Sequence, residues 1–251
     1  MVDAEYFDRW YADIERSSAR QAVVTTYLGL PPEVGPSNLV PLAGLREIAQ
    51  RLGLRRDGLL VDLACGRGGP GMWVARECGA RIAGVDFSVE AVRQATARRA
   101  LFGLDERATF SVGELTASGL GDGVADGVLC IDAVQFASPT DAATAEMRRL
   151  LRPEGVAVLT GWEPLSPDDP EVPERLRHLD LGAALTAAGF ADVMVEVRPS
   201  WRAIERSLWE HALTLPADGD PAIESMHAEA ERVLPTFDRF RRVLAIARSF
   251  A

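Results

Sequence analysis

Short apolar segments alternate with helical segments along most of the chain, and this alternation constrains the fold more than any other feature. The apolar segments are continuous and of strand length, which is typical of strands buried on both faces of a sheet. Strands separated by helices predict an α/β, doubly wound and mostly parallel sheet. The first five predicted strands are residues 59–64, 80–87, 108–115, 126–134 and 156–162.

Helix-boundary residues support the segments between the strands. Ser88 is a suitable N-cap for a helix that follows it, and Pro70 and Gly79 mark the start and end of another. Further helices are predicted over 44–54, 141–155 and 181–190. Pro153 and Gly155 would end the second of these.

The last quarter of the chain changes pattern. Residues 192–199 alternate strictly, as a sixth strand would, and 198–240 is predicted to form helices interrupted by "PADGDP". No linker divides the sequence, so we predict a single domain over 1–251. Its predicted parts are an N-terminal helical cap (1–41), a core (42–197), a helical insertion (198–240) and a closing strand (241–251).

The loop "VDLACGRGGPG" contains Gly66, Gly68 and Gly71, which spell the glycine pattern of dinucleotide-binding loops. Asp62, however, lies inside the strand that leads into this loop. Three more acids, Asp86, Glu114 and Asp132, stand at or near the ends of later strands. Ligands of open α/β sheets bind at this edge. Four carboxylates suit ribose hydroxyls, an adenine amino group, an α-ammonium group and a sulfonium better than a pyrophosphate. We therefore expect S-adenosyl-L-methionine as the ligand.

Five segments resemble the ordered motifs of class I, Rossmann-like S-adenosylmethionine-dependent methyltransferases of the small-molecule type. They are "VDLACGRGG", "GVDFS", "GEL", "DGVLCIDAVQF" and "RRLLRPEGVAVLTGW". The resemblance implies a seven-stranded sheet whose C-terminal strand is reversed. It also implies S-adenosyl-L-homocysteine as product and the following cofactor-binding residues: Asp62, Ala64, Cys65, Gly66 and Gly68 around the methionine part, Asp86 at the ribose, Phe87, Gly113, Glu114 and Leu115 around the adenine, and Asp132 and Ala133 beside the methionine moiety.

Three residues depart from the pattern of the family. Ala64 stands where glycine is usual, Glu114 where aspartate is commoner, and Gln135 where many small-molecule members carry histidine. A general base is therefore not evident. His178, which follows a proline-rich loop, and Gln135 are weak catalytic candidates, and His211 and His227 are weaker still.

Aromatic residues are concentrated in the parts of the chain where members of the family differ. The first predicted helix carries Tyr6, Phe7, Trp10 and Tyr11. This helix either packs on the body or closes over the cofactor as a lid, in which case Tyr11 would contact the cofactor. The candidates for the acceptor pocket are Gln135, Phe136, Trp162, His178 and Trp201.

Composition and charge limit the partners and the compartment. The net charge of −10 disfavours a nucleic-acid surface, which needs clustered Lys and Arg. No apolar run is long enough for a membrane span, and the first residues do not resemble a secretion signal. The three cysteines lack zinc-like spacing, so no metal site is predicted. We expect a cytoplasmic monomer or homodimer that acts on a small molecule.

Three functions remain open at this stage. The first is methyl transfer to a small, largely apolar acceptor, catalysed mainly by positioning and placed in secondary metabolism by analogy. The second is a methyltransferase-like protein that binds the cofactor without methylating, as a cyclase or a binding module. The third is a nicotinamide oxidoreductase. The glycine pattern of the loop favours this function, and Asp62 inside the preceding strand disfavours it.

Overall fold

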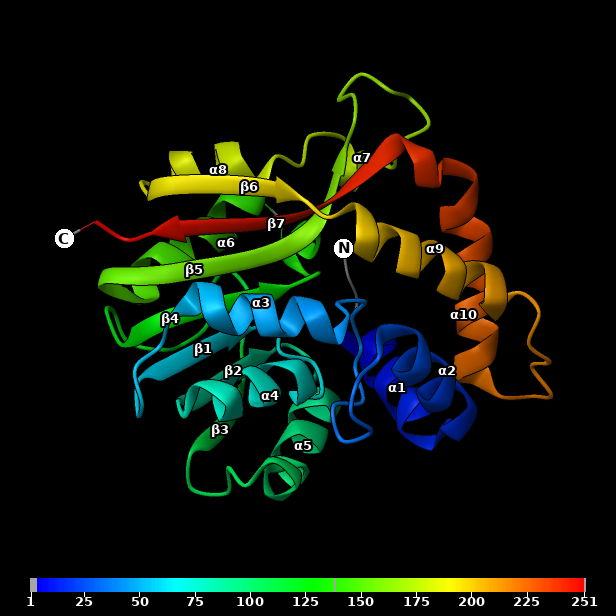
Figure 1. The fold of residues 1–251 in the computed structure, drawn as a ribbon, viewed down its shortest axis with the longest axis horizontal. Helices are drawn as coiled ribbons and strands as arrows, with labels where there is room; N and C mark the ends of the chain where they lie inside the picture. Colours follow the sequence, from blue (N-terminus) through cyan, green and yellow to red (C-terminus); the bar gives the residue numbers. More distant parts are fainter. Residues whose placement is uncertain (1–3, 138, 251) are drawn as a thin grey trace.

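A computed structural model describes residues 4–137 and 139–250, and it has a seven-stranded sheet between two layers of helices (Figure 1). The strand order is β3-β2-β1-β4-β5-β7-β6, and only β7 runs antiparallel to its neighbours. This order confirms the predicted doubly wound sheet with a reversed C-terminal strand. The strands are β1 (Leu59–Leu63), β2 (Arg81–Asp86), β3 (Ala108–Val112), β4 (Ala125–Ile131), β5 (Leu151–Pro164), β6 (Ala191–Val197) and β7 (Phe240–Arg248).

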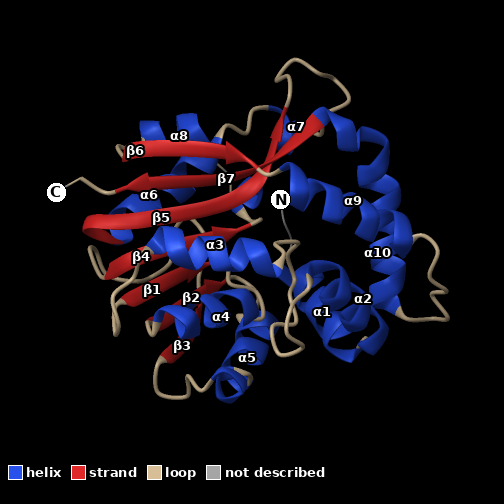
Figure 2. Ribbon diagram, viewed as in Figure 1, coloured by secondary structure: helices blue, strands red, loops and turns tan. Residues whose placement is uncertain are grey.

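Helices cover both faces of the sheet (Figure 2). On one face lie α3 (Leu42–Leu52) and α4 (Gly69–Cys78), with α5 (Val89–Ala97) against β2 and β3. On the other lie α6 (Thr140–Leu150) and α8 (Leu181–Ala187), with the short α7 (Glu174–Arg177) near the end of β5. Two separate buried clusters result, one on each face, as expected for strands that are buried on both sides.

The predicted helix over 141–155 is too long. The structure ends α6 at Leu150, and β5 begins at the next residue, where Leu151 pairs with Ala125 before the register shifts. Glu154 has φ of +64°, a conformation incompatible with a continuing helix. Pro153 and Gly155 therefore belong to an irregular strand entry rather than to a helix end.

Four further helices stand at the carboxyl end of the sheet. Helices α1 (Ala4–Arg16) and α2 (Ser18–Leu28) form the cap, and α9 (Pro199–Ala212) and α10 (Pro221–Val233) form the insertion, followed by the 3₁₀ segment η3 (Leu234–Arg239). They lie together on one side of the molecule in Figure 1. Residues 1–3 of the predicted cap and residue 251 of the predicted closing strand lie outside the described residues.

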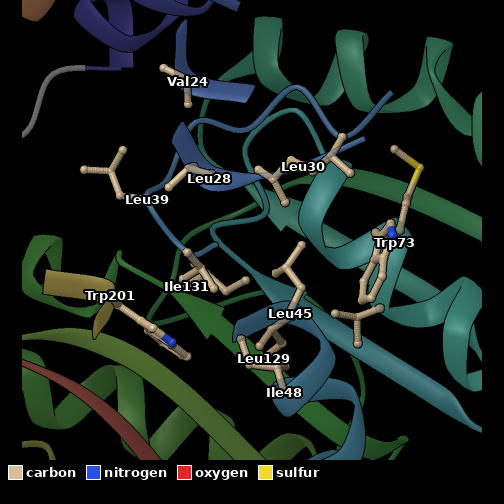
Figure 3. Close-up of a cluster of buried hydrophobic side chains, with 14 of the residues drawn as sticks. Val24, Leu28, Leu30, Leu39, Leu45, Ile48, Trp73, Leu129, Ile131 and Trp201 are labelled. Atoms are coloured by element: carbon tan, nitrogen blue, oxygen red, sulfur yellow. The ribbon is translucent and has the colours of Figure 1, made fainter. Parts of the chain in front are cut away.

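The cap and the insertion share one apolar core with the sheet (Figure 3). Leu28 of α2, Ile48 of α3, Leu129 of β4 and Trp201 of α9 all belong to this cluster. Burial of side chains from four distant segments in one cluster fixes the cap and the insertion against the same sheet face. Among the described residues, no helix is long and apolar enough to cross a membrane.

Gly69 provides a test of how the segment before α3 packs on α4. A Cβ at this position would lie 1.7 Å from the carbonyl oxygen of Val34, a backbone atom that cannot rotate away. We predict that Gly69→Ala lowers the free energy of unfolding by about 1–3 kcal/mol, although alanine is the better helix former. Urea unfolding is the measurement. Gly161→Ala, whose added Cβ would make an ordinary 3.8 Å contact, is the control. An unchanged Gly69→Ala variant would contradict the packing.

Candidate active site

A cavity of about 1080 Å³ opens at the carboxyl ends of the strands. Its floor consists of residues that follow β1, β2, β3 and β4, and its walls come from the cap and from α9, α10 and η3. Pockets for one small ligand span ~300–1000 Å³. The cavity is therefore large enough for two small molecules side by side.

All four acids predicted at the sheet edge line this cavity. Asp86 is buried and accepts hydrogen bonds from the backbone N–H groups of Gly66 (2.8 Å) and Ser88 (3.0 Å). Burial raises its pKa to about 6, against the effect of those two bonds. Burial, and then the nearby Asp86, raise the pKa of Asp62 to about 8. Both carboxyls are poised to gain from a positively charged ligand.

The glycine loop is shaped around the acid and the cap. Gly71 lies inside α4, where a Cβ would come within 2.0 Å of Oδ2 of Asp62. The glycine that completes the dinucleotide spelling therefore makes room for the Asp62 carboxyl. A Cβ on Gly66 would lie 2.6 Å from Oγ of Ser37 and 2.9 Å from the Tyr11 hydroxyl. The bare backbone at Gly66 thus allows the cap to pack closely over the loop.

Two buried arginines, Arg20 of the cap and Arg67 of the glycine loop, have no carboxylate within ion-pair distance among the described residues. Arg20 lines the cavity, stacks on Trp10 and donates to the carbonyl of Pro36 at 3.3 Å. Burial, and the nearby Arg67, lower its pKa to about 10. Nε and Nη1 of Arg67 are buried without a hydrogen-bond partner. Because Arg20 lines the cavity, its positive charge favours an anionic group beside it.

Aromatic rings link the cap to the sheet edge. Phe7 lies 5.3 Å from Phe87 and 5.8 Å from Phe136, measured between ring centroids, and it also contacts Tyr11. Phe87 follows β2, Phe136 follows β4, and both line the cavity. The first helix thus packs on the body and also covers the cavity, so the two interpretations of its aromatic face are not exclusive.

A buried ionic group joins Asp132, Arg242 and Glu205 on the opposite wall. Arg242 of β7 is fully buried and contacts both carboxylate oxygens of Asp132, at 2.6 and 2.7 Å. Its Nε lies 3.8 Å from Glu205, and its guanidinium stacks 4.1 Å from the Trp162 ring. Glu205 is only 4% exposed yet lines the cavity, and it accepts from the indole N–H of Trp162 at 2.9 Å.

Most of the predicted site residues line the cavity. Those that do are Tyr11, Asp62, Ala64, Cys65, Asp86, Phe87, Gly113, Glu114, Leu115, Asp132, Ala133, Gln135, Phe136 and Trp162. Gly66 and Gly68 do not line it.

Two residues predicted at the site, His178 and Trp201, do not line the cavity. His178 is exposed at the end of α7 and does not line the cavity, so it is poorly placed for a base. Trp201 is buried in the core against Gly44 instead of facing the cavity.

Sequence reasoning missed several lining residues, namely Arg20, Ser37, Asn38, Leu39 and Glu205. No local motif marks them. They reach the cavity only through the packing of the cap and of α9. The Glu205–Trp209 pair, four residues apart on one helix face, was the only available signal.

Residues 60–155 match a model described as "Methyltransferase domain". Over 141 residues the chain is 29% identical to 24-methylenesterol C-methyltransferase 2 of Oryza sativa subsp. japonica, covering 55% of this chain and 39% of that protein. Over 125 residues it is 30% identical to methyltransferase GfsG of Streptomyces halstedii, covering 48% and 45%. The chain thus spans less than half the length of these relatives.

Two solved structures share the fold. One is phosphoethanolamine N-methyltransferase 2 of Haemonchus contortus with phosphomonomethylethanolamine and S-adenosylhomocysteine (TM-score 0.75, 18% identity, 100% of this chain and 61% of that one). The other is the [4+2]-cyclase SpnF (TM-score 0.70, 24% identity, 82% and 80%).

The raised pKa of Asp62 predicts how stability depends on pH. The folded pKa of about 8 lies above the ordinary value near ~4, so the unfolded chain ionises first and stability falls as pH rises between them. Asp62→Asn should remove this loss of stability. The unfolding free energy of the variant, relative to that of the wild type, should therefore rise by more than about 1 kcal/mol between pH 5.5 and 8. Urea unfolding at both pH values measures it, with the exposed Asp105→Asn as control. Parallel pH dependence of Asp62→Asn and the wild type would refute the assignment.

Proposed function

Because the chain belongs to the class I S-adenosylmethionine-dependent methyltransferases, we propose that it transfers a methyl group to a small, largely apolar acceptor of secondary metabolism. One observation carries the proposal. A single cavity combines four carboxyl groups at the sheet edge with apolar and aromatic side chains from the cap, α9, α10 and η3. We assign the part at the sheet edge to the cofactor and the part lined by α9, α10 and η3, called the acceptor half, to the acceptor.

The residues present fit S-adenosylmethionine. Asp86 keeps free lone pairs for the ribose hydroxyls after accepting two backbone N–H groups. Glu114 would accept from the adenine amino group, with Phe87 and Leu115 beside the ring. Asp62 and Asp132 would face the positively charged amino-acid tail, and Arg20 its carboxylate. When bound, the cofactor supplies an electrophilic methyl carbon on a positively charged sulfur.

The residues of this chain contribute position and exclusion of water. The cap covers the cofactor region through Phe7 and Tyr11, and it is tied to α5 because Asp8 accepts from Ser88 Oγ (2.5 Å) and from the N–H of Glu90 (3.1 Å). We propose that it acts as a lid. Methyl transfer is an in-line displacement, so alignment in a closed, dry chamber provides most of the rate enhancement.

A second candidate function is a cyclase that uses the same pocket. The similarity to SpnF over 82% of this chain favours it, at a TM-score of 0.70. Both functions require the cofactor site, and only methyl transfer consumes the cofactor.

Calorimetry and a labelled-methyl assay separate the candidates. We expect S-adenosylmethionine and S-adenosylhomocysteine to bind at micromolar concentration and NAD not to bind. Transfer of labelled methyl to an extractable apolar acceptor would establish the methyltransferase. Binding of both adenosyl ligands with no methyl transfer across apolar acceptors would favour the cyclase, and NAD binding alone would overturn both.

Arg20 tests the contact between the cap and the cofactor. Arg20→Gln should weaken S-adenosylhomocysteine binding by about tenfold or more, because a charge-assisted hydrogen bond to the carboxylate is lost. It should change the affinity for 5′-methylthioadenosine, which lacks the amino-acid tail, by less than about threefold. The exposed Arg16→Gln serves as control. Equal losses for both ligands would count against the carboxylate contact.

A further inference from the structure

We propose that the acceptor half of the cavity recognises an apolar amine, whose ammonium group binds the Glu205 carboxylate that the indole N–H groups of Trp162 and Trp209 hold in place. This inference rests on the proposed function and adds the chemical class of the acceptor. It also assigns Glu205 as the group that takes the ammonium proton.

Glu205 lies on the face of α9 that lines the cavity. On α9, Arg202, Glu205 and Trp209 line the cavity from one helix face. The Glu205 carboxylate accepts from the indole N–H of Trp162 at 2.9 and 3.1 Å and from that of Trp209 at 3.4 Å. The two indole N–H groups hold the carboxylate in place, and the carboxylate supplies the opposite charge that attracts an ammonium group.

The buried group of Asp132, Glu205 and Arg242 holds two acids and one cation. Arg242 lies close to both Asp132 and Glu205. Two of its nitrogens contact the Asp132 carboxylate, at 2.6 and 2.7 Å. Glu205 reaches only its Nε, at 3.8 Å. When both acids are ionised, this buried group carries one uncompensated negative charge. A cationic guest neutralises that charge, and a neutral alcohol of the same shape does not.

Two arginines near this wall have partners of their own. Arg202 donates to Asp238 at 2.6 Å and to the carbonyls of Phe237 and Phe240, and Arg232 of α10 pairs with Glu229. Neither arginine is therefore the close partner of Glu205. Burial raises the pKa of Glu205 to about 7. The charge of Arg242 and the hydrogen bond from Trp162 act against this rise, and the charge of Asp132 adds to it.

Gln135 supplies a further acceptor on the sheet side of the cavity. Its Nε2 donates to the backbone carbonyl of Asp132 at 2.7 Å, which fixes the orientation of the amide. Its Oε1 is then buried without a hydrogen-bond partner among the described residues. An unpaired buried acceptor favours a guest that carries N–H donors.

The proton transfer balances without any other reagent. The ammonium R–NH₃⁺ gives one proton to Oε of Glu205, which leaves the neutral amine R–NH₂ and the carboxylic acid. The N–H bond breaks towards nitrogen, so the lone pair that a methyl acceptor needs becomes free. A group with a pKa near the working pH is suited to accept and release this proton.

The test compares two probes of nearly the same shape, 2-naphthylmethylamine and 2-naphthalenemethanol, by calorimetry on the protein loaded with S-adenosylhomocysteine. The wild type should bind the amine at least about tenfold more tightly than the alcohol at pH 8. Glu205→Gln should remove that preference while S-adenosylhomocysteine still binds within about threefold. Glu210→Gln, at an exposed position on the same helix, should change neither value.

A second measurement uses only the wild type and so does not depend on folding of the variant. Amine affinity should fall as the pH drops through about 7, where Glu205 becomes protonated, and alcohol affinity should stay level. Equal affinity for the two probes, or no affinity for either, would overturn the inference while S-adenosylhomocysteine binding leaves the proposed function standing. Loss of S-adenosylhomocysteine binding in the wild type would overturn both.

Discussion

The Asp132 carboxylate is the interaction on which the rest of the site depends. It contacts Arg242 of the reversed strand β7, accepts from Thr160 of β5 at 2.6 Å and accepts from the backbone N–H of Leu39 at 3.2 Å. One side chain at the end of β4 therefore holds the central strands, the closing strand and the loop that leads from the cap. Asp132 has φ of +56°, a strained conformation for a residue with a side chain. These three partners stabilise that conformation, because a buried charge without partners would cost far more.

The cavity divides into two regions of opposite electrostatic character. Acids at the sheet edge face the region proposed for the cofactor, whereas Arg20 of the cap brings positive charge to the same cavity. A zwitterionic amino-acid tail matches both regions at once. The cap and the sheet edge are far apart in the sequence, so this match depends on how the cap docks. Phe7 and Asp8 provide that docking from a single turn of α1.

The fold was largely predictable because its signals are local. Buried strands show as continuous apolar runs, and Ser88 and Gly79 cap helices where the sequence placed their ends. The end of α6 was not predictable from Pro153 and Gly155, because pairing of Leu151 with Ala125 overrides the helical pattern. The candidate site was predictable where it follows strand ends. It was not predictable for Trp201, since an aromatic residue on an amphipathic helix packs equally well into a core or a cavity.

The sequence by itself determined the order of strands and helices along the chain, since each element follows from a short run of neighbouring residues. It also determined which acids stand at the strand ends and where the loop has small residues. Only the tertiary structure decided that Arg20 and Glu205 reach the cavity and that His178 does not. It also decided that Gly71 makes room for Asp62. These outcomes depend on distances between segments separated by many residues. Such distances are set by packing of the cap and insertion on the shared core, which no local pattern encodes.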